Sequence, residues 1–230
     1  MNRALAVTTS FAASIVRVGT GLTVTVAGRE PARRLDLYEY ESCPFCRKVR
    51  EALSILDLEA TIYPCPKGGQ RFRETVRTRG GKLQFPWLVD PNTGTAMYES
   101  DDIVRYLFTT YGDGNVPLAL ALGPVTLLSS ALASAVRLGA GTYHRPAKVP
   151  EQPLELWSFE ASPYCRLARE TLCELELPYV LHNVAKGSRH RDAFVRRTGT
   201  MQVPYLLDPN TGTGMFESAD IVAYLERTYG

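Results

Sequence analysis

The feature of this 230-residue chain that most constrains its fold is an internal repeat. Residues 97–112 and 215–230 are closely similar, and both begin with Met, an aromatic residue, Glu and Ser. The turn Asp-Pro-Asn-Thr-Gly-Thr precedes both segments, at 90–95 and 208–213. Matched positions are 118 or 119 residues apart throughout, so the chain contains two copies of one structural unit.

Strand-like runs, helix-like runs and turn residues follow one another in the same order in both copies. The order is βαβαββα, and the turn between the last two strands makes them an antiparallel hairpin. This order of elements predicts a small α/β layered domain in each half of the chain, at 1–115 and 116–230. The expected strands are 35–40, 59–64, 86–89, 95–98, 154–159, 178–182, 204–207 and 213–216, and the expected helices are 44–57, 69–79, 100–110, 163–175, 188–198 and 217–228.

The duplication extends upstream into two apolar stretches that end in Gly-x-Gly, at 11–21 and 131–141. We therefore expect a short apolar helix before each unit, near 10–18 and at 125–138. Exposing such apolar surface would be unfavourable, so both helices should pack on one or both units and give a compact pseudo-twofold pair. Gly123 and Pro124 interrupt the second stretch, which argues against a transmembrane segment, although contact with a membrane surface stays open.

The composition excludes several classes of function. A net charge of +2 predicts no strong attraction to nucleic acid. Five cysteines, an odd number with irregular spacing, fit a reducing compartment better than a secreted disulfide framework. Residues 1–29 contain no Asp or Glu, as in a transit peptide, but the upstream repeat indicates that residues 10–30 belong to the fold.

Chemistry is concentrated in the run Cys43-Pro-Phe-Cys46, at an expected strand-to-helix junction. Unpaired N–H groups and the macrodipole at a helix start stabilise a thiolate, so Cys43 should be nucleophilic near neutral pH. Cys46 lies one turn further on and could attack a mixed disulfide on Cys43. Two half-buried structural thiols, or half of a zinc site, are the alternatives. No second Cys-x-x-Cys or His-x-His follows, so a redox or glutathione-related role is favoured and no metal is expected.

These motifs, with an x-Pro strand and a Glu-Ser helix start downstream, resemble the N-terminal thioredoxin-like domain of glutathione transferases. The Cys-Pro-x-Cys form is similar to that of glutaredoxins and omega-class transferases. The presence of two such units in one chain resembles the tandem thioredoxin-family proteins of plant and algal plastids. The resemblance covers residues 35–112 and 154–230, here called repeat one and repeat two. It implies an α/β fold of two tandem thioredoxin-like domains, glutathione as the ligand and a plastid location.

The resemblance also implies roles for individual residues. Cys43 and Cys46 would be catalytic. The x-Pro pairs would present a cis-proline strand to the cysteinyl part of glutathione, and the Glu-Ser pairs would hold its γ-glutamyl end. The implied glutathione-binding residues are Phe45, Phe85, Pro86, Glu99, Ser100, Ser162, Val203, Pro204, Glu217 and Ser218.

Repeat two departs from this pattern, because Ser162 stands where repeat one has Cys43. Ser162 could donate to a glutathione thiolate or cap the helix of a degenerate domain, and Ser100 and Ser218 could equally be helix caps. Cys65 is expected to be partly exposed and free to form a disulfide, whereas Cys165 and Cys173 are expected to be buried.

The function predicted from the sequence is that of a glutathione-dependent thiol–disulfide oxidoreductase acting through Cys43. Its partners would be glutathione and protein disulfides, and nothing predicts an oligomeric state. The alternative is a non-catalytic glutathione-binding or assembly module, because the helical domain of a transferase is missing and repeat two lacks the first cysteine. A glutathione-bridged iron–sulfur cluster on Cys43 is a third option.

Overall fold

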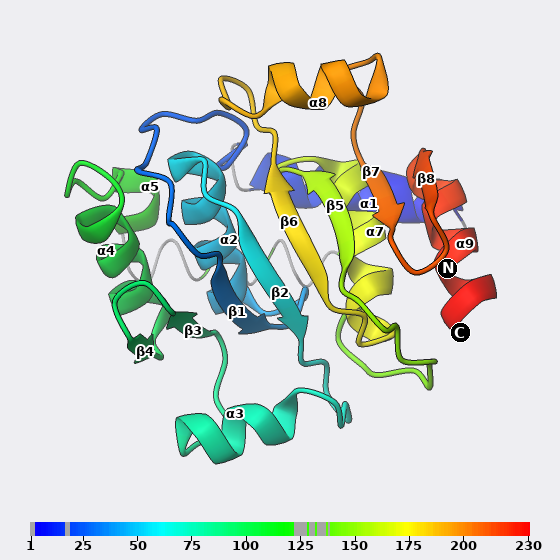
Figure 1. Ribbon diagram of the computed structural model, residues 1–230, viewed down its shortest axis with the longest axis horizontal. Coiled ribbons are helices and arrows are strands. Elements are labelled where there is room, and N and C mark those ends of the chain that lie inside the picture. The colour runs from blue at the N-terminus through cyan, green and yellow to red at the C-terminus, as the bar shows by residue number, and fades with distance from the viewer. Residues whose placement is uncertain (1–2, 17–18, 122–127, 129–131, 133–136, 138) are drawn as a thin grey trace.

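The computed structural model describes residues 3–16, 19–121, 128, 132, 137 and 139–230 (Figure 1). The described residues form one sheet of eight strands in the order β4-β3-β1-β2-β6-β5-β7-β8. The strands are β1 Leu35–Glu39, β2 Ala60–Pro64, β3 Trp87–Asp90, β4 Thr95–Met97, β5 Leu154–Ser158, β6 Tyr179–Asn183, β7 Tyr205–Asp208 and β8 Thr213–Phe216. The helices are α1 Arg3–Val16, α2 Pro44–Leu56, α3 Arg73–Gly80, α4 Ser100–Thr110, α5 Leu118–Ala121, α7 Pro163–Glu174, α8 Arg191–Thr198 and α9 Ser218–Tyr229.

The sheet joins the two repeats through β2 and β6, which pair antiparallel at its centre. Within each repeat the first two strands are parallel and the last two form the expected antiparallel hairpin. Thr61 faces Val180, the matched position of the other repeat, so the pseudo-twofold axis passes through this pair. The fold therefore contains two thioredoxin-like units, as predicted. The structure adds that they share one sheet and that one apolar core runs through both.

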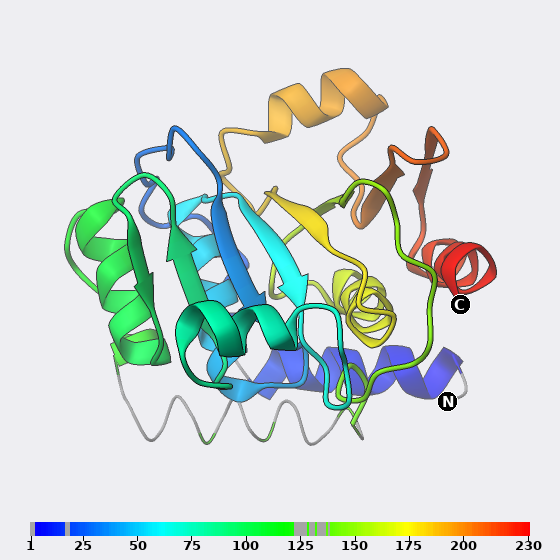
Figure 2. The same cartoon turned by 60° about the horizontal axis from the view of Figure 1, so that its bottom comes forward.

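Helix α1 lies across repeat two and not across the repeat that it precedes (Figures 1 and 2). The Ser10 hydroxyl donates to the carbonyl of Pro163 at 2.7 Å, and the Ser14 hydroxyl donates to that of Ala161 at 2.8 Å. The expected helix near 10–18 thus begins earlier, at Arg3, and packs on α7. Gly19 follows it with a φ of 67°, the left-handed conformation predicted for the Gly-x-Gly stop.

Other expectations for the apolar segments are less fully tested. Most of the predicted helix at 125–138 lies outside the described residues, which include only 128, 132 and 137 of it. Among the described residues, no helix is long and apolar enough to cross a membrane. The domain boundary between residues 115 and 116 stays a prediction, although α1, which precedes repeat one, packs on α7 of repeat two.

An acidic residue at the end of the first long helix of each repeat holds a loop of the other repeat. Glu176 accepts the backbone N–H groups of Gln70 and Arg71, at 3.1 and 3.3 Å. Its counterpart Asp57 accepts the N–H of Arg189 at 2.8 Å. The helix predicted at 69–79 therefore begins only at Arg73, because Glu176 holds the preceding N–H groups in a turn. The helix predicted at 188–198 likewise begins late, at Arg191.

Arginine and glutamate side chains form a buried ion network beneath the sheet, between α2 and α7. Arg50 of repeat one donates to Glu160 of repeat two at 2.9 Å. Arg169 of repeat two donates to Glu41 of repeat one at 3.1 and 3.2 Å. All four side chains are at most 3% exposed. Each ion pair crosses the pseudo-twofold axis, so the network fastens the repeats to each other.

Candidate functional site

Cys43 occupies the N-cap position of α2, where Pro44 starts the helix without an unpaired N–H group. The N–H of Cys46 donates to the Cys43 sulfur at 3.4 Å. Burial opposes ionisation of Cys43, which is 2% exposed. Hydrogen bonds from the Cys46 side chain and from the N–H groups of Cys46 and Phe45 outweigh it, so the pKa of Cys43 is lowered.

The other four cysteines are less acidic than an ordinary thiol. Burial raises the pKa of Cys46, Cys65, Cys165 and Cys173, each of which is at most 2% exposed. The expectation that Cys65 is partly exposed is wrong, because its side chain lies in an aromatic cluster with Tyr38 and Trp87. All five thiols are free, so no disulfide joins Cys65 to the motif.

Tyr40 is a residue near Cys43 that the motifs did not reveal. Burial and the neighbouring thiols of Cys43 and Cys46 raise the pKa of Tyr40. Repeat two has Phe159 at the matched position, so the hydroxyl occurs only beside the cysteine. Comparing matched positions of the two repeats could have identified Tyr40 from the sequence.

The predicted cis-prolines are present at Phe85–Pro86 and Val203–Pro204. Phe85 packs edge-on against Tyr40, with 6.0 Å between ring centroids, so the cis-proline strand lies beside the cysteine motif. The Arg73 guanidinium stacks 5.0 Å from the centre of the Phe85 ring. Repeat one therefore brings together a thiol and an extended backbone edge, as the resemblance implied, and the structure adds a cation, Arg73.

The Glu-Ser pairs have the same unusual geometry in both repeats. Glu99 and Glu217 have φ values of 66° and 67°, a conformation rare for residues other than glycine. Each glutamate accepts a hydrogen bond of 2.6 Å from a glutamine just upstream of the x-Pro pair. Ser100 and Ser218 are each 4% exposed and are the first residues of α4 and α9. Neither hydroxyl hydrogen-bonds a described residue, so the structure does not support their reading as caps.

Repeat two keeps this arrangement but presents no thiol at its first motif position. The Ser162 hydroxyl accepts the N–H of Cys165 at 3.2 Å and so caps α7, which was one of its two expected roles. That bond leaves its O–H free to donate. Phe45 and Tyr164, the third residues of the two motifs, are each 44% exposed.

The buried ion network connects the two sites, because Glu41 and Glu160 each lie two residues before a motif's first position. Burial alone would raise the pKa of Glu160, but Arg169 and Arg50 outweigh it and hold that pKa at about 2.

In repeat one, Lys48 of α2 also binds Asp101 beside Ser100. Among the described residues, no group of His, Cys, Asp and Glu could hold a metal ion.

Comparison with known proteins agrees with this geometry. The family model for the glutathione S-transferase N-terminal domain matches residues 37–115 and again residues 156–230. No curated protein matches. Among solved structures, Leishmania TDR1, described as a unique trimeric glutathione transferase, is 14% identical over 84% of this chain and 68% of that chain, with a TM-score of 0.29. Because the family model covers most of the chain, the protein belongs to the glutathione S-transferase N-terminal domain family, with one copy in each half.

Proposed function

We propose that this protein is a glutathione-dependent thiol–disulfide oxidoreductase that acts through Cys43. The observation that carries the proposal is the contrast among its cysteines: the pKa is lowered at Cys43 and raised at the other four. A thiolate is the reactive form in disulfide exchange. The family membership supports glutathione as the ligand.

In the proposed reaction, the Cys43 thiolate attacks the glutathione sulfur of a mixed disulfide, R–S–S–G. A bond forms between Cys43 and glutathione, the bond between R–S and that sulfur breaks, and R–S⁻ leaves and takes a proton from water. The thiolate of a free glutathione then attacks the bound glutathione sulfur. Oxidised glutathione leaves and the Cys43 thiolate is restored.

Glutathione would lie across the motifs of repeat one. The backbone before cis-Pro86 offers an extended edge to its cysteinyl unit. The buried Ser100 hydroxyl and the N–H groups at the start of α4 suit the γ-glutamyl carboxylate. Glu99, with an exposed carboxylate, suits the ammonium group.

Cys46 has a narrower role in this proposal than the sequence suggested. Burial raises its pKa well above that of an ordinary thiol, so it is rarely the thiolate that resolution of a mixed disulfide requires. Its side chain instead stabilises the Cys43 thiolate by a hydrogen bond. We therefore propose that a second glutathione, and not Cys46, usually releases the bound one. Cys46→Ser should then retain most of the activity.

The test is an assay with hydroxyethyl disulfide and glutathione on purified wild type and Cys43→Ser. We expect turnover in wild type and none in the variant, whereas Cys165→Ser, which alters a buried thiol of repeat two, should leave turnover unchanged. Absence of activity from wild type, or its survival in Cys43→Ser, would remove the proposal.

A second candidate is a glutathione-binding or assembly module without turnover. The burial of Cys43, which is 2% exposed, favours it, because a disulfide must reach the sulfur before exchange can occur. Glutathione binding without activity would support this candidate. Action on protein disulfides, glutathione binding in repeat two and a plastid location remain predictions.

A further inference from the structure

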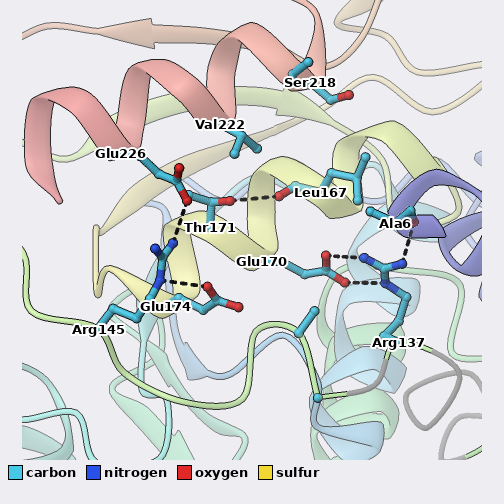
Figure 3. A pocket seen from close by; sticks show the side chains of 13 residues that line it. Ala6, Arg137, Arg145, Leu167, Glu170, Thr171, Glu174, Ser218, Val222 and Glu226 are labelled. Atoms are coloured by element: carbon cyan, nitrogen blue, oxygen red, sulfur yellow. Dashed lines mark hydrogen bonds and ion pairs between the residues drawn. The ribbon is translucent and has the colours of Figure 1, made fainter. Parts of the chain in front are cut away.

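A cavity of about 350 Å³ lies on the sheet where β2 of repeat one meets β6 of repeat two. Thr61 and Val180, the pair on the pseudo-twofold axis, line it, and so does Tyr63. It contains none of the residues assigned to glutathione above. It is also distinct from the larger cavity between α7 and α9, whose Arg137 and Arg145 are already paired with glutamates (Figure 3). Its volume is within the range of small-molecule sites.

The cavity lies on the face of the sheet that points away from α2 and α7. Ala60 and Ile62 of β2 belong to the apolar core, so Thr61 and Tyr63, which alternate with them, point to the opposite face. In Figure 1, α3 and α8 lie at opposite ends of this face, and no described helix covers β2 and β6 between them. A ligand can therefore approach the centre of the sheet from this side.

Thr61 has a hydroxyl that the protein itself does not use. The residue is 8% exposed, lines the cavity, and makes no side-chain hydrogen bond to any residue that the structure describes. Val180, which faces it across the axis, is apolar and offers no partner. Burying a hydroxyl without a partner is unfavourable, and a bound polar group would remove that cost. The floor of the cavity is therefore suited to a polar ligand group.

The charges around the cavity favour a cation. Two carboxylates, those of Glu151 and Glu155, line it together with one guanidinium, that of Arg34. Arg34 lies 3.9 Å from Glu59, which offsets its charge. One oxygen of Glu155 lies 3.0 Å from the Nε2 atom of His182, so that contact orients the carboxylate. The other oxygen makes no hydrogen bond to a described residue and is left for a ligand.

The aromatic side chains on this face already bind guanidinium groups. Arg79 lies 5.8 Å from the ring centre of Trp87, and Arg197 lies 5.0 Å from that of Trp157. Tyr63 packs in the same cluster as Trp87 and lines the cavity, and among the described residues no cation lies over its ring. The cavity thus offers a further ring of this layer to a planar cation.

We propose that this cavity binds a small molecule that carries a guanidinium group. The guanidinium lies against the Tyr63 ring and donates to the free oxygen of Glu155 and to the Thr61 hydroxyl. Val180 contacts its alkyl chain, and the exposed carboxylate of Glu151 favours a second positive charge at the far end of that chain. Binding requires neither glutathione nor the cysteine motif.

Agmatine, an alkyl guanidinium with an ammonium at its other end, is the probe, measured by isothermal titration calorimetry on the full chain. Wild type should bind one agmatine per chain. Glu155→Gln should weaken binding at least about tenfold, because it removes the charge that faces the guanidinium. The control is Asp102→Asn, which removes an exposed carboxylate of α4 and should change the affinity by less than about twofold. Thermal denaturation confirms that each variant is folded.

The hydroxyl and the head group are tested separately. Thr61→Val gives β2 the residue of the matched position in β6 and should weaken agmatine about fivefold without lowering the thermal midpoint. Cadaverine, with an ammonium in place of the guanidinium, should bind wild type at least about fivefold more weakly than agmatine.

Agmatine binding that is absent from wild type, or equal in wild type and both cavity variants, overturns the proposal. Cadaverine that binds as tightly as agmatine overturns the guanidinium assignment. A blocked arginine peptide that binds more tightly than agmatine overturns the assignment to a small molecule. Loss of glutathione turnover in Cys43→Ser has no bearing on any of these outcomes.

Discussion

The two repeats have the same strand order and cis-prolines but differ around the first motif position. Repeat one has Cys43 with the Tyr40 hydroxyl against it, whereas repeat two has a capping Ser162 with Phe159 alongside. The shared skeleton shows that the fold does not by itself provide a nucleophile. A few side chains at the start of one helix determine which repeat can carry out thiol chemistry.

The repeats also differ along the groove between their first and last long helices. Lys48 and Asp101 form an ion pair across it in repeat one, and Leu167 and Ala219 leave a cavity in repeat two. One copy therefore has the thiol and the other has the space between its helices. The buried ion network meanwhile fixes the two copies in one body.

The largest expected effect concerns the thiol that distinguishes the repeats. Cys43→Ser gives repeat one the first motif residue of repeat two, and we expect turnover of hydroxyethyl disulfide to fall at least about 100-fold because no reactive thiolate remains. The reciprocal Ser162→Cys should not restore it in the Cys43→Ser background, because repeat two lacks both the Tyr40 hydroxyl and the Phe85 ring against which Arg73 stacks. Restored turnover in that double variant would show that one residue alone separates the repeats.

A large effect on stability is expected where the repeats join. Glu160→Gln removes the buried carboxylate that Arg50 and Arg169 share, which should lower the free energy of unfolding by about 3–5 kcal/mol. The control is Glu74→Gln, whose partner Arg77 is exposed, with an expected change of at most about 0.5 kcal/mol. Urea denaturation measures both, and equal small losses would contradict a fastening role.

The same carboxylate makes stability depend on pH. The pKa of Glu160 is about 2 in the folded protein and 4.5 for the unperturbed group. Because the folded value is lower, its contribution is complete above pH 4.5 and is lost as the pH falls from 4.5 towards 2. Urea midpoints across this range should decline more steeply for wild type than for Glu160→Gln, and parallel declines would argue against the assignment.

A smaller effect, on glutathione affinity, should distinguish the Glu-Ser pair of repeat one from that of repeat two. If glutathione binds mainly in repeat one, Ser100→Ala should weaken it about tenfold by removing a hydrogen bond to a carboxylate. Ser218→Ala should then change glutathione affinity by less than about twofold. Calorimetric titration with glutathione compares the two, and the reverse ranking would move the glutathione site to repeat two.

The smallest expected effect is on the pKa of the nucleophile. Tyr40→Phe reproduces the residue of repeat two and removes a hydroxyl near Cys43, so the pKa of Cys43 should rise by at most about one unit. Tyr164→Phe removes a hydroxyl from the exposed third position of the other motif and should leave that pKa unchanged. An unaltered pKa in Tyr40→Phe would exclude Tyr40 from stabilising the thiolate.

The local parts of the fold could be predicted from the sequence, because each depends on neighbouring residues. The hairpin turns, the helix beginning at Pro44 and the burial of Cys165 and Cys173 are examples. The family resemblance supplied the cis-prolines and the Glu-Ser helix starts. These features recur in both repeats, so the motifs could be recognised by comparing the two halves of this one sequence.

Features that depend on contacts between residues distant in the sequence could not be predicted in the same way. The late start of α3 results from Glu176, which is distant in the chain, and the burial of Cys65 results from packing against Tyr38 and Trp87. The exchange of α1 onto α7 has no local signal either. The cavity lies where Leu167 and Ala219 replace Lys48 and Asp101, and comparing α7 and α9 with α2 and α4 reveals this difference.

The pH dependence of alkylation at each cysteine tests the central claim most directly. Iodoacetamide labelling of the folded protein, followed by mass spectrometry of each cysteine peptide, gives one titration curve per thiol. Cys43 should react fastest and titrate below 9.0, the ordinary thiol value, while Cys46, Cys65, Cys165 and Cys173 should titrate above it. If Cys43 titrates at or above 9.0, or reacts no faster than Cys165 of repeat two, the structure does not make it a nucleophile.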